Sequence, residues 1–149
     1  LFEMLILEGF QAGLSWECVL NKQEAFRRAF DDFDWDKVSA YDEARQAALY
    51  ADPGIIRNRR KIAAAVGNAA VFAAIRQEFG SFDSYLWQWT GGKTLVERGP
   101  TTSPLSDAIS KDLKKRGMKF VGSTIIYAYL QAVGVLYAHE PGCFLEAAP

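Results

Sequence analysis

The chain has 149 residues, of which 50% are hydrophobic and 23% are charged, and this is the composition of one folded domain with enough apolar surface for a core. No stretch approaches the roughly 20 uninterrupted apolar residues of a membrane-spanning helix, which excludes membrane insertion. The chain contains one histidine and two cysteines, so it cannot hold a four-ligand metal site made only of these residue types. Cys18 and Cys143 lie far apart, which favours a reducing cytoplasm over secretion.

The net charge of −1 conceals an uneven distribution along the chain. Residues 1–56 contain 5 basic and 11 acidic side chains, whereas residues 57–149 contain 12 basic and 7 acidic ones. Such asymmetry is typical of a protein with a polyanion-binding face, although solvated helix faces are the alternative. The basic residues gather in two clusters: Arg57, Arg59, Arg60 and Lys61, and Lys111, Lys114, Lys115, Arg116 and Lys119.

Helical periodicity dominates the sequence, and no alternating strand of useful length is evident. We expect helices over residues 1–9, 15–29, 42–50, 56–79, 106–116 and 122–138. Two further short helices are expected, one after the acidic turn 31–36 and an aromatic one that begins at Ser81 or Asp83. Residues 90–104 form the one long loop. We therefore predict a compact all-α domain of roughly seven or eight short helices, with residues 1–149 as a single unit.

Two serines are predicted to begin helices. Ser15 precedes an apolar stripe, and Ser106 precedes the helix that ends near Gly117, so each is expected to accept a backbone N–H as an N-cap. Cys18 is expected to be a core residue.

A sharp break at Asp52-Pro53-Gly54 separates two predicted helices within residues 42–66, and arginines follow it directly. The start of a helix offers unpaired N–H groups and a positive dipole, and a glycine lets a phosphate approach the backbone. The pattern therefore favours a phosphate-binding hairpin, with an ordinary turn between two helices as the alternative.

Glu8 is the one charged residue in the apolar run from Met4 to Gly9. Glu3 and Glu8 are five residues apart, about 140° around a helix, so one solvated stripe cannot easily hold both. A carboxylate buried by apolar neighbours has a raised pKa or meets a cation, and both situations are typical of functional sites. The alternative is a helix-end glutamate that reaches solvent.

Trp16 follows Glu8 after one glycine-bounded turn and is a candidate to stack on a flat cationic ligand, with core packing as the alternative. The aromatic side chains of Tyr85, Trp87 and Trp89 have no single convergent face and are expected to be core or loop anchors. His139 and Cys143 stand four residues apart, a spacing that suits two ligands of one zinc ion.

Four motifs, taken together, resemble the DNA-3-methyladenine glycosylase I family over essentially the whole chain. The motifs are LFEMLILEGFQAGLSW (1–16), DPGIIRNRRKI (52–62), DAISKDLKKRGMKFVGSTI (107–125) and HEPGC (139–143). The resemblance implies an all-α helix-hairpin-helix protein that excises alkylated bases from DNA. Ile56 stands where the broader superfamily usually has a second glycine, a substitution that fits this particular family.

The resemblance also implies roles for individual residues. Glu8 matches the pocket carboxylate that recognises the methylated base and is important for activity, and Trp16 matches a pocket aromatic. Gly13 and Leu14 match the element that enters the duplex where the base has left. The phosphate-binding hairpin is expected to use Gly54, Ile55, Arg57 and Arg59.

His139 and Cys143 match two of four ligands of a structural zinc ion. We expect the other two ligands, with further pocket aromatics, in a segment that would precede Leu1, and so weak or no stoichiometric zinc in the chain as it stands. The expected partner is double-stranded DNA with alkylated bases, bound by a cytoplasmic monomer. The open alternatives are a non-catalytic helix-hairpin-helix DNA-binding module and an all-α enzyme that never touches DNA.

Overall fold

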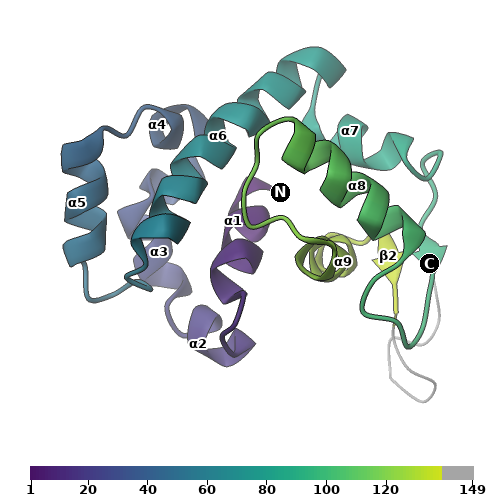
Figure 1. The fold of residues 1–149 in the computed structure, drawn as a ribbon, viewed down its shortest axis with the longest axis horizontal. Coiled ribbons are helices and arrows are strands. Elements are labelled where there is room, and N and C mark those ends of the chain that lie inside the picture. The colour runs from purple at the N-terminus through teal and green to yellow at the C-terminus, as the bar shows by residue number, and fades with distance from the viewer. Residues whose placement is uncertain (139–149) are drawn as a thin grey trace.

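The computed structural model describes residues 1–138 and confirms an all-α architecture (Figure 1). The helices are α1 (Phe2–Gln11), α2 (Trp16–Leu20), α3 (Gln23–Ala29), the 3-10 turn η1 (Asp31–Phe33), α4 (Trp35–Ser39), α5 (Glu43–Ala51), α6 (Arg59–Phe79), α7 (Phe82–Gln88), α8 (Pro104–Lys115) and α9 (Ser123–Ala132). Within this range no helix is both long and apolar enough to cross a bilayer.

The predicted helix over 15–29 is divided into two. Ser15 caps α2 as expected, because its side chain accepts the Cys18 N–H at 3.2 Å. The chain leaves the helix at Asn21 and Lys22, where φ reaches −107° at Lys22, and resumes as α3. Cys18 is only half-buried, so the expectation that it belongs to the core is wrong.

Two further helix boundaries differ from those expected. Ser103 caps α8 by accepting the Ser106 N–H, while the Ser106 hydroxyl accepts the Ser103 N–H in return, so Ser106 completes a capping box and does not begin the helix. The last helix ends at Ala132, because Gly134 adopts φ 86°. The following β2 (Leu136–Tyr137) pairs in parallel with β1 (Leu95–Val96) from the long loop.

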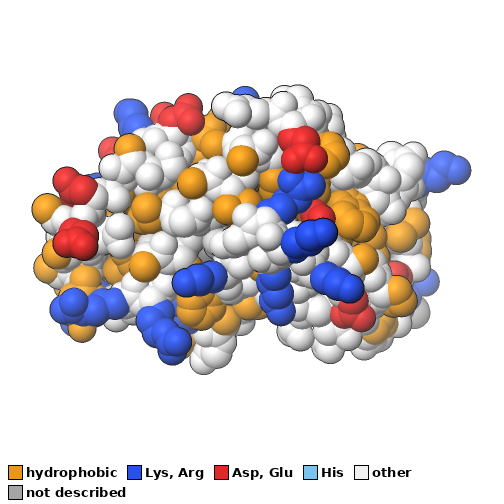
Figure 2. All heavy atoms as spheres, turned by 45° about the horizontal axis from the view of Figure 1, so that its top comes forward, with side chains coloured by type: hydrophobic (Ala, Val, Ile, Leu, Met, Phe, Trp, Pro, Cys, Tyr) orange, Lys and Arg blue, Asp and Glu red, His pale blue; other side chains and the backbone are white. Residues whose placement is uncertain are grey.

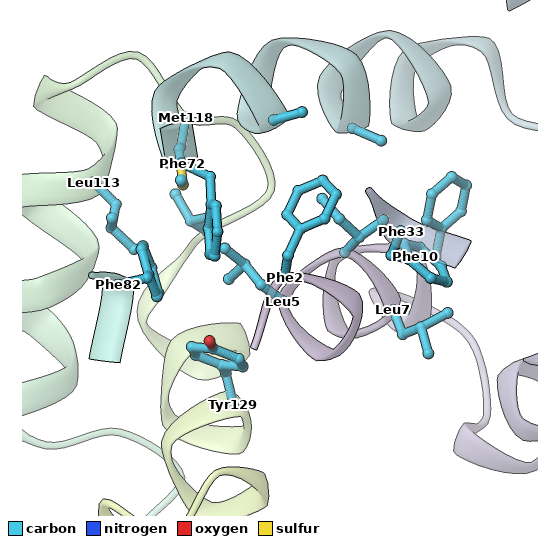
Figure 3. Close-up of a cluster of buried hydrophobic side chains, with 14 of the residues drawn as sticks. Phe2, Leu5, Leu7, Phe10, Phe33, Phe72, Phe82, Leu113, Met118 and Tyr129 are labelled. Carbon is cyan, nitrogen blue, oxygen red and sulfur yellow. The ribbon is translucent and has the colours of Figure 1, made fainter. Parts of the chain in front are cut away.

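Helix α1 lies in the middle of the molecule and packs against α2, α6 and α9 (Figure 1). Its ends are held by aromatic contacts: the Phe2 ring lies 5.1 Å from that of Phe72 on α6, and the Phe10 ring lies 4.8 Å from that of Phe26 on α3. Figure 3 shows the apolar side chains of α1 among those of the surrounding helices. These residues join one continuous hydrophobic cluster, and burial of each large side chain contributes about 1.5–3 kcal/mol.

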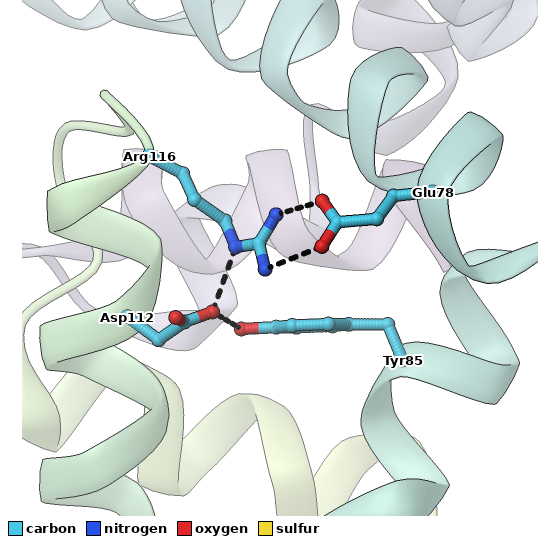
Figure 4. A network of polar contacts seen from close by, with 4 residues as sticks. All are labelled: Glu78, Tyr85, Asp112 and Arg116. Carbon is cyan, nitrogen blue, oxygen red and sulfur yellow. Dashed lines mark hydrogen bonds and ion pairs between the residues drawn. The ribbon is translucent and has the colours of Figure 1, made fainter.

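A polar network joins the C-terminal end of α6 to α7 and α8 (Figure 4). Arg116 donates from Nε to Asp112 at 2.8 Å and from a terminal nitrogen to Glu78 at 2.6 Å. The Tyr85 hydroxyl donates to the same Asp112 carboxylate at 2.6 Å, and Tyr85 is fully buried, as its expected anchor role requires. Arg116 is therefore occupied within the fold, unlike the exposed lysines of its cluster.

Replacing Arg116 by lysine is expected to destabilise the fold by about 1 kcal/mol, because one ammonium cannot bridge Glu78 and Asp112 as the guanidinium does. Urea unfolding measures the change, with Lys114→Arg, an exposed position in the last turn of α8, as the control. An unfolding midpoint equal to that of the parent protein would show that the network contributes nothing.

Candidate functional site

Glu8 is buried in α1, where the whole run from Leu5 to Phe10 is excluded from water. The residue is 5% exposed, and burial raises the pKa of its carboxyl from 4.5 to about 7. No hydrogen bond or ion pair from residues 1–138 reaches its carboxylate. Glu3, by contrast, accepts hydrogen bonds from Arg27 at 2.7 Å and Gln23 at 3.1 Å. With only 5% of its surface exposed, Glu8 does not extend freely into solvent, which counts against the alternative of a solvated helix-end glutamate.

The turn after α1 is exposed and projects an apolar side chain. Gly13 has φ 79°, a left-handed conformation that favours glycine, and a side chain there would meet no atom within 4 Å. Leu14 is 38% exposed, and its N–H donates to the Gln11 carbonyl at 2.7 Å. Trp16 begins α2 directly afterwards and is partly buried against the core, so the structure leaves part of its side chain accessible.

In the hairpin between α5 and α6, the backbone N–H of Gly54 is not free to bind a phosphate. The Gly54 N–H already donates to the Asp52 carboxylate at 2.8 Å, so Asp52 occupies the donor that a phosphate would use. A Cβ at Gly54 would lie 3.0 Å from the Ala25 methyl, which means that packing against α3 requires a small residue here. The Ile55 side chain is 2% exposed and belongs to the core, so only its backbone can contact a ligand.

Free backbone donors follow Gly54. No acceptor from residues 1–138 is assigned to the N–H groups of Ile55, Ile56 and Arg57. The next helix, α6, begins at Arg59 and not near Ile56, because the Asn58 side chain caps it by accepting the Lys61 N–H at 3.1 Å. Consecutive free N–H groups before a long helix suit an anion.

Arginines surround these donors. Arg57 and Arg59 are exposed, and the Arg59 guanidinium lies 4.2 Å from the centroid of the Tyr50 ring. Stacking of this kind holds the guanidinium while its N–H edges stay available. Figure 2 shows Lys and Arg side chains in a broken row across the lower part of one face. Tyr50 was not among the expected site residues, since only the folded hairpin brings it beside Arg59.

Lys61 departs most from its expected place in the basic cluster. Its side chain is buried, and its Nζ donates to the carbonyls of Phe10 at 2.9 Å and Ala12 at 2.7 Å. Burial lowers the pKa of this ammonium. The sequence does contain an indication that Lys61 is buried, because its helical spacing places it on the same buried stripe of α6 as Ala65 and Phe72.

His139 and Cys143 lie outside the described residues, so the zinc site stays a prediction. Among residues 1–138, no three His, Cys, Asp or Glu side chains come together in a group that could hold a metal ion.

Comparison with known proteins decides the family. The family model described as methyladenine glycosylase matches residues 1–146. The chain belongs to this family. It is 45% identical to the DNA-3-methyladenine glycosylase 1 of Escherichia coli K12, over 96% of this chain and 80% of that protein. It is 38% identical to the DNA-3-methyladenine glycosylase of Haemophilus influenzae, with the same coverage of both chains.

Solved structures of methyladenine glycosylases share the fold. One crystal structure of 3-methyladenine DNA glycosylase I has a TM-score of 0.92 and 43% identity, over 99% of this chain and 84% of the other. The enzyme from Staphylococcus aureus, described in a study of 3-methyladenine recognition, has a TM-score of 0.93 and 34% identity, over 99% and 81% of the two chains.

The raised pKa of Glu8 predicts how the stability of this methyladenine glycosylase depends on pH. Between pH 4.5 and about 7 the folded state keeps a proton that the unfolded state releases, so the free energy of unfolding falls as pH rises through this window. Glu8→Gln removes the penalty and is expected to be more stable than the parent at pH 8 by about 2–3 kcal/mol, with little difference near pH 4.5.

Urea unfolding at the two pH values measures this difference. Glu17→Gln, which removes an exposed carboxylate on α2, is the control and is expected to leave the pH dependence unchanged. A parent protein and Glu8→Gln variant with parallel pH profiles would contradict the prediction.

Proposed function

We propose that the protein is a DNA base-excision repair glycosylase that hydrolyses the N-glycosidic bond of 3-methyladenine in alkylated DNA after the base has been flipped out of the duplex. The observation that carries the proposal is Glu8, a buried carboxylate with no cationic partner among the described residues. Relatives at 38–45% identity are named DNA-3-methyladenine glycosylases. Glycosylases reach their target base by extruding it from the stack.

The chemistry of the lesion suits so sparse a site. Methylation at N3 gives adenine a positive charge and makes it a good leaving group, so no strong general acid is needed. The ionised Glu8 carboxylate faces the flipped-out cationic base, and the Trp16 ring stacks on that base. Water adds to the sugar carbon and loses a proton, while the bonding electrons return to the departing base and leave it neutral.

The same pairing gives selectivity. In a buried site an ion pair is much stronger than in water, because the dielectric response is weak. A cationic base supplies the counter-charge that Glu8 lacks and favours its ionised form, whereas neutral adenine would leave the carboxylate uncompensated. Undamaged adenine is therefore bound weakly, although its shape is nearly the same.

The hairpin holds the DNA by its phosphates. The free N–H groups of Ile55 to Arg57 and the exposed side chains of Arg57 and Arg59 supply the donors and positive charge that a phosphate requires. Such contacts position the duplex without reading its sequence. The exposed Gly13–Leu14 turn then enters the space that the flipped base leaves. Gly54 contributes by letting the hairpin pack against α3.

We extend the proposal to the setting of the enzyme. We infer a monomer in the cytoplasm; the free thiol of Cys18 is consistent with a reducing compartment. A structural zinc ion would take His139 and Cys143 as ligands, a proposal that rests on the family resemblance. No step of the reaction is assigned to this ion.

Glu8→Gln tests the proposal directly. The neutral amide cannot stabilise the cationic base, so we expect single-turnover release of 3-methyladenine from methylated DNA to fall about 100-fold. Glu17→Gln is the control, with release unchanged. Release equal to that of the parent would remove Glu8 from the mechanism, and DNA binding without any release by the parent would instead identify a non-catalytic module.

Arg57→Gln tests the hairpin contact. Loss of one phosphate contact is expected to reduce the slope of log affinity against log salt concentration by about 0.9, because fewer counterions are released. Lys93→Gln, in the loop far along the chain, is the control. A slope that does not change would mean that the arginine side chain makes no phosphate contact.

A further inference from the structure

The Lys61 ammonium connects two parts of the proposed DNA-binding surface. Lys61 lies in the first turn of α6, immediately after the hairpin, and is only 9% exposed. Its Nζ donates to the carbonyls of Phe10 and Ala12, which are 51 and 49 positions away in sequence. These two carbonyls belong to the end of α1, just before the exposed Gly13–Leu14 turn.

A buried ammonium with these partners is unusual. Removing a cation from water is costly, and burial is the cause of the lowered pKa of Lys61. Within residues 1–138 its side chain has no carboxylate partner; both acceptors are main-chain oxygens. The final carbonyls of a helix lack intrahelical donors and carry the negative end of its dipole, so a cation stabilises them. The contact therefore fixes the end of α1, and not another side chain.

The turn has few other ties to the hairpin side of the molecule. Its own hydrogen bonds are local: the Leu14 N–H donates to the Gln11 carbonyl, and the Gln11 side chain donates to the Leu14 carbonyl at 2.7 Å. These bonds shape the turn but do not orient it relative to α6. A side chain at Gly13 would touch nothing, and Leu14 is exposed. The Lys61 bonds add a direct polar tie between α6 and the last carbonyls before the turn, beyond the packing of α1 against α6.

We propose that Lys61 is a positioning residue that holds the Gly13–Leu14 turn at a fixed place relative to the phosphate-binding hairpin. When the hairpin binds the phosphates, the turn is then already oriented for insertion into the duplex. This inference rests on the proposed function. Without the Lys61 hydrogen bonds the hairpin still binds phosphates, but the turn must become ordered when it is inserted. The cost of this ordering lowers the affinity only of complexes in which the turn is inserted.

The test compares two duplexes of the same sequence in the full-length protein, one undamaged and one with a tetrahydrofuran abasic analogue that leaves space for the turn. For Lys61→Met, which keeps the length of the side chain but has no donor, we expect a loss of about tenfold in preference for the abasic duplex, equivalent to about 1.4 kcal/mol. Affinity for the undamaged duplex stays within about twofold of the parent value. Lys37→Met, an exposed lysine on α4, is the control with both affinities unchanged.

A double mutant separates positioning from general stability. If Lys61 acts through the turn, Lys61→Met added to Leu14→Ala costs no further preference, because the inserting side chain is already absent. A retained preference in Lys61→Met, even with a lower unfolding midpoint, would overturn the inference and leave a structural role only. An equal loss on both duplexes would also overturn it. If Lys61→Met does not fold, Lys61→Gln, whose amide reaches one carbonyl, takes its place in the same measurements.

The proposed function is tested separately in the same preparation. Base release by the parent protein on methylated DNA reports catalysis, whereas preference for the abasic duplex reports insertion. A parent that prefers the abasic duplex but releases no 3-methyladenine would contradict the proposed function while the Lys61 comparison still stands. A parent with no preference for the abasic duplex would overturn the Lys61 inference itself.

Discussion

Burial of α1 is the constraint around which the molecule is organised. The helix crosses the centre of the fold, and its residues from Leu5 to Phe10 are covered by α2, α6, α9 and the aromatic contacts of α3. A helix in this position must satisfy its polar groups within the protein, because water cannot reach them. Two groups of α1 stand out: the carbonyls at its end, which need hydrogen-bond donors, and the Glu8 carboxylate, which needs a counter-charge when it is ionised.

The carbonyls at the end of α1 have a partner within the fold, whereas the Glu8 carboxylate has none among the described residues. The carbonyls receive the Lys61 ammonium from α6, so that end of the helix is satisfied and held. Glu8 receives no partner from the described residues, and its pKa is raised to about 7. A group left in this state costs stability near neutral pH, a typical trade between stability and activity at a functional site. Under the proposed function, a cationic base supplies the counter-charge that the described residues do not give to Glu8.

The hairpin shows the same division between structure and function. Gly54 allows close packing against α3, because a larger residue would clash with Ala25. Its N–H donates to the Asp52 carboxylate. The donors without partners come next, at Ile55 to Arg57, and Tyr50 holds Arg59 beside them. The basic clusters of the sequence are also divided: Arg116 and Lys61 stabilise the fold, whereas Arg57, Arg59 and Lys119 remain exposed.

Local spacing and the contrast between a residue and its neighbours were enough to predict the helical class, the break at Asp52-Pro53-Gly54, the Ser15 cap and the burial of Glu8. The sequence pattern misplaced the start of α6 and the end of α9, where Asn58 and Gly134 decide, and it treated Lys61 and Arg116 as free cations. The burial of Lys61 and the contacts of Arg116 depend on how helices distant in sequence pack together. The acceptors of Lys61 lie about fifty positions away, and no local pattern encodes a partner at that distance.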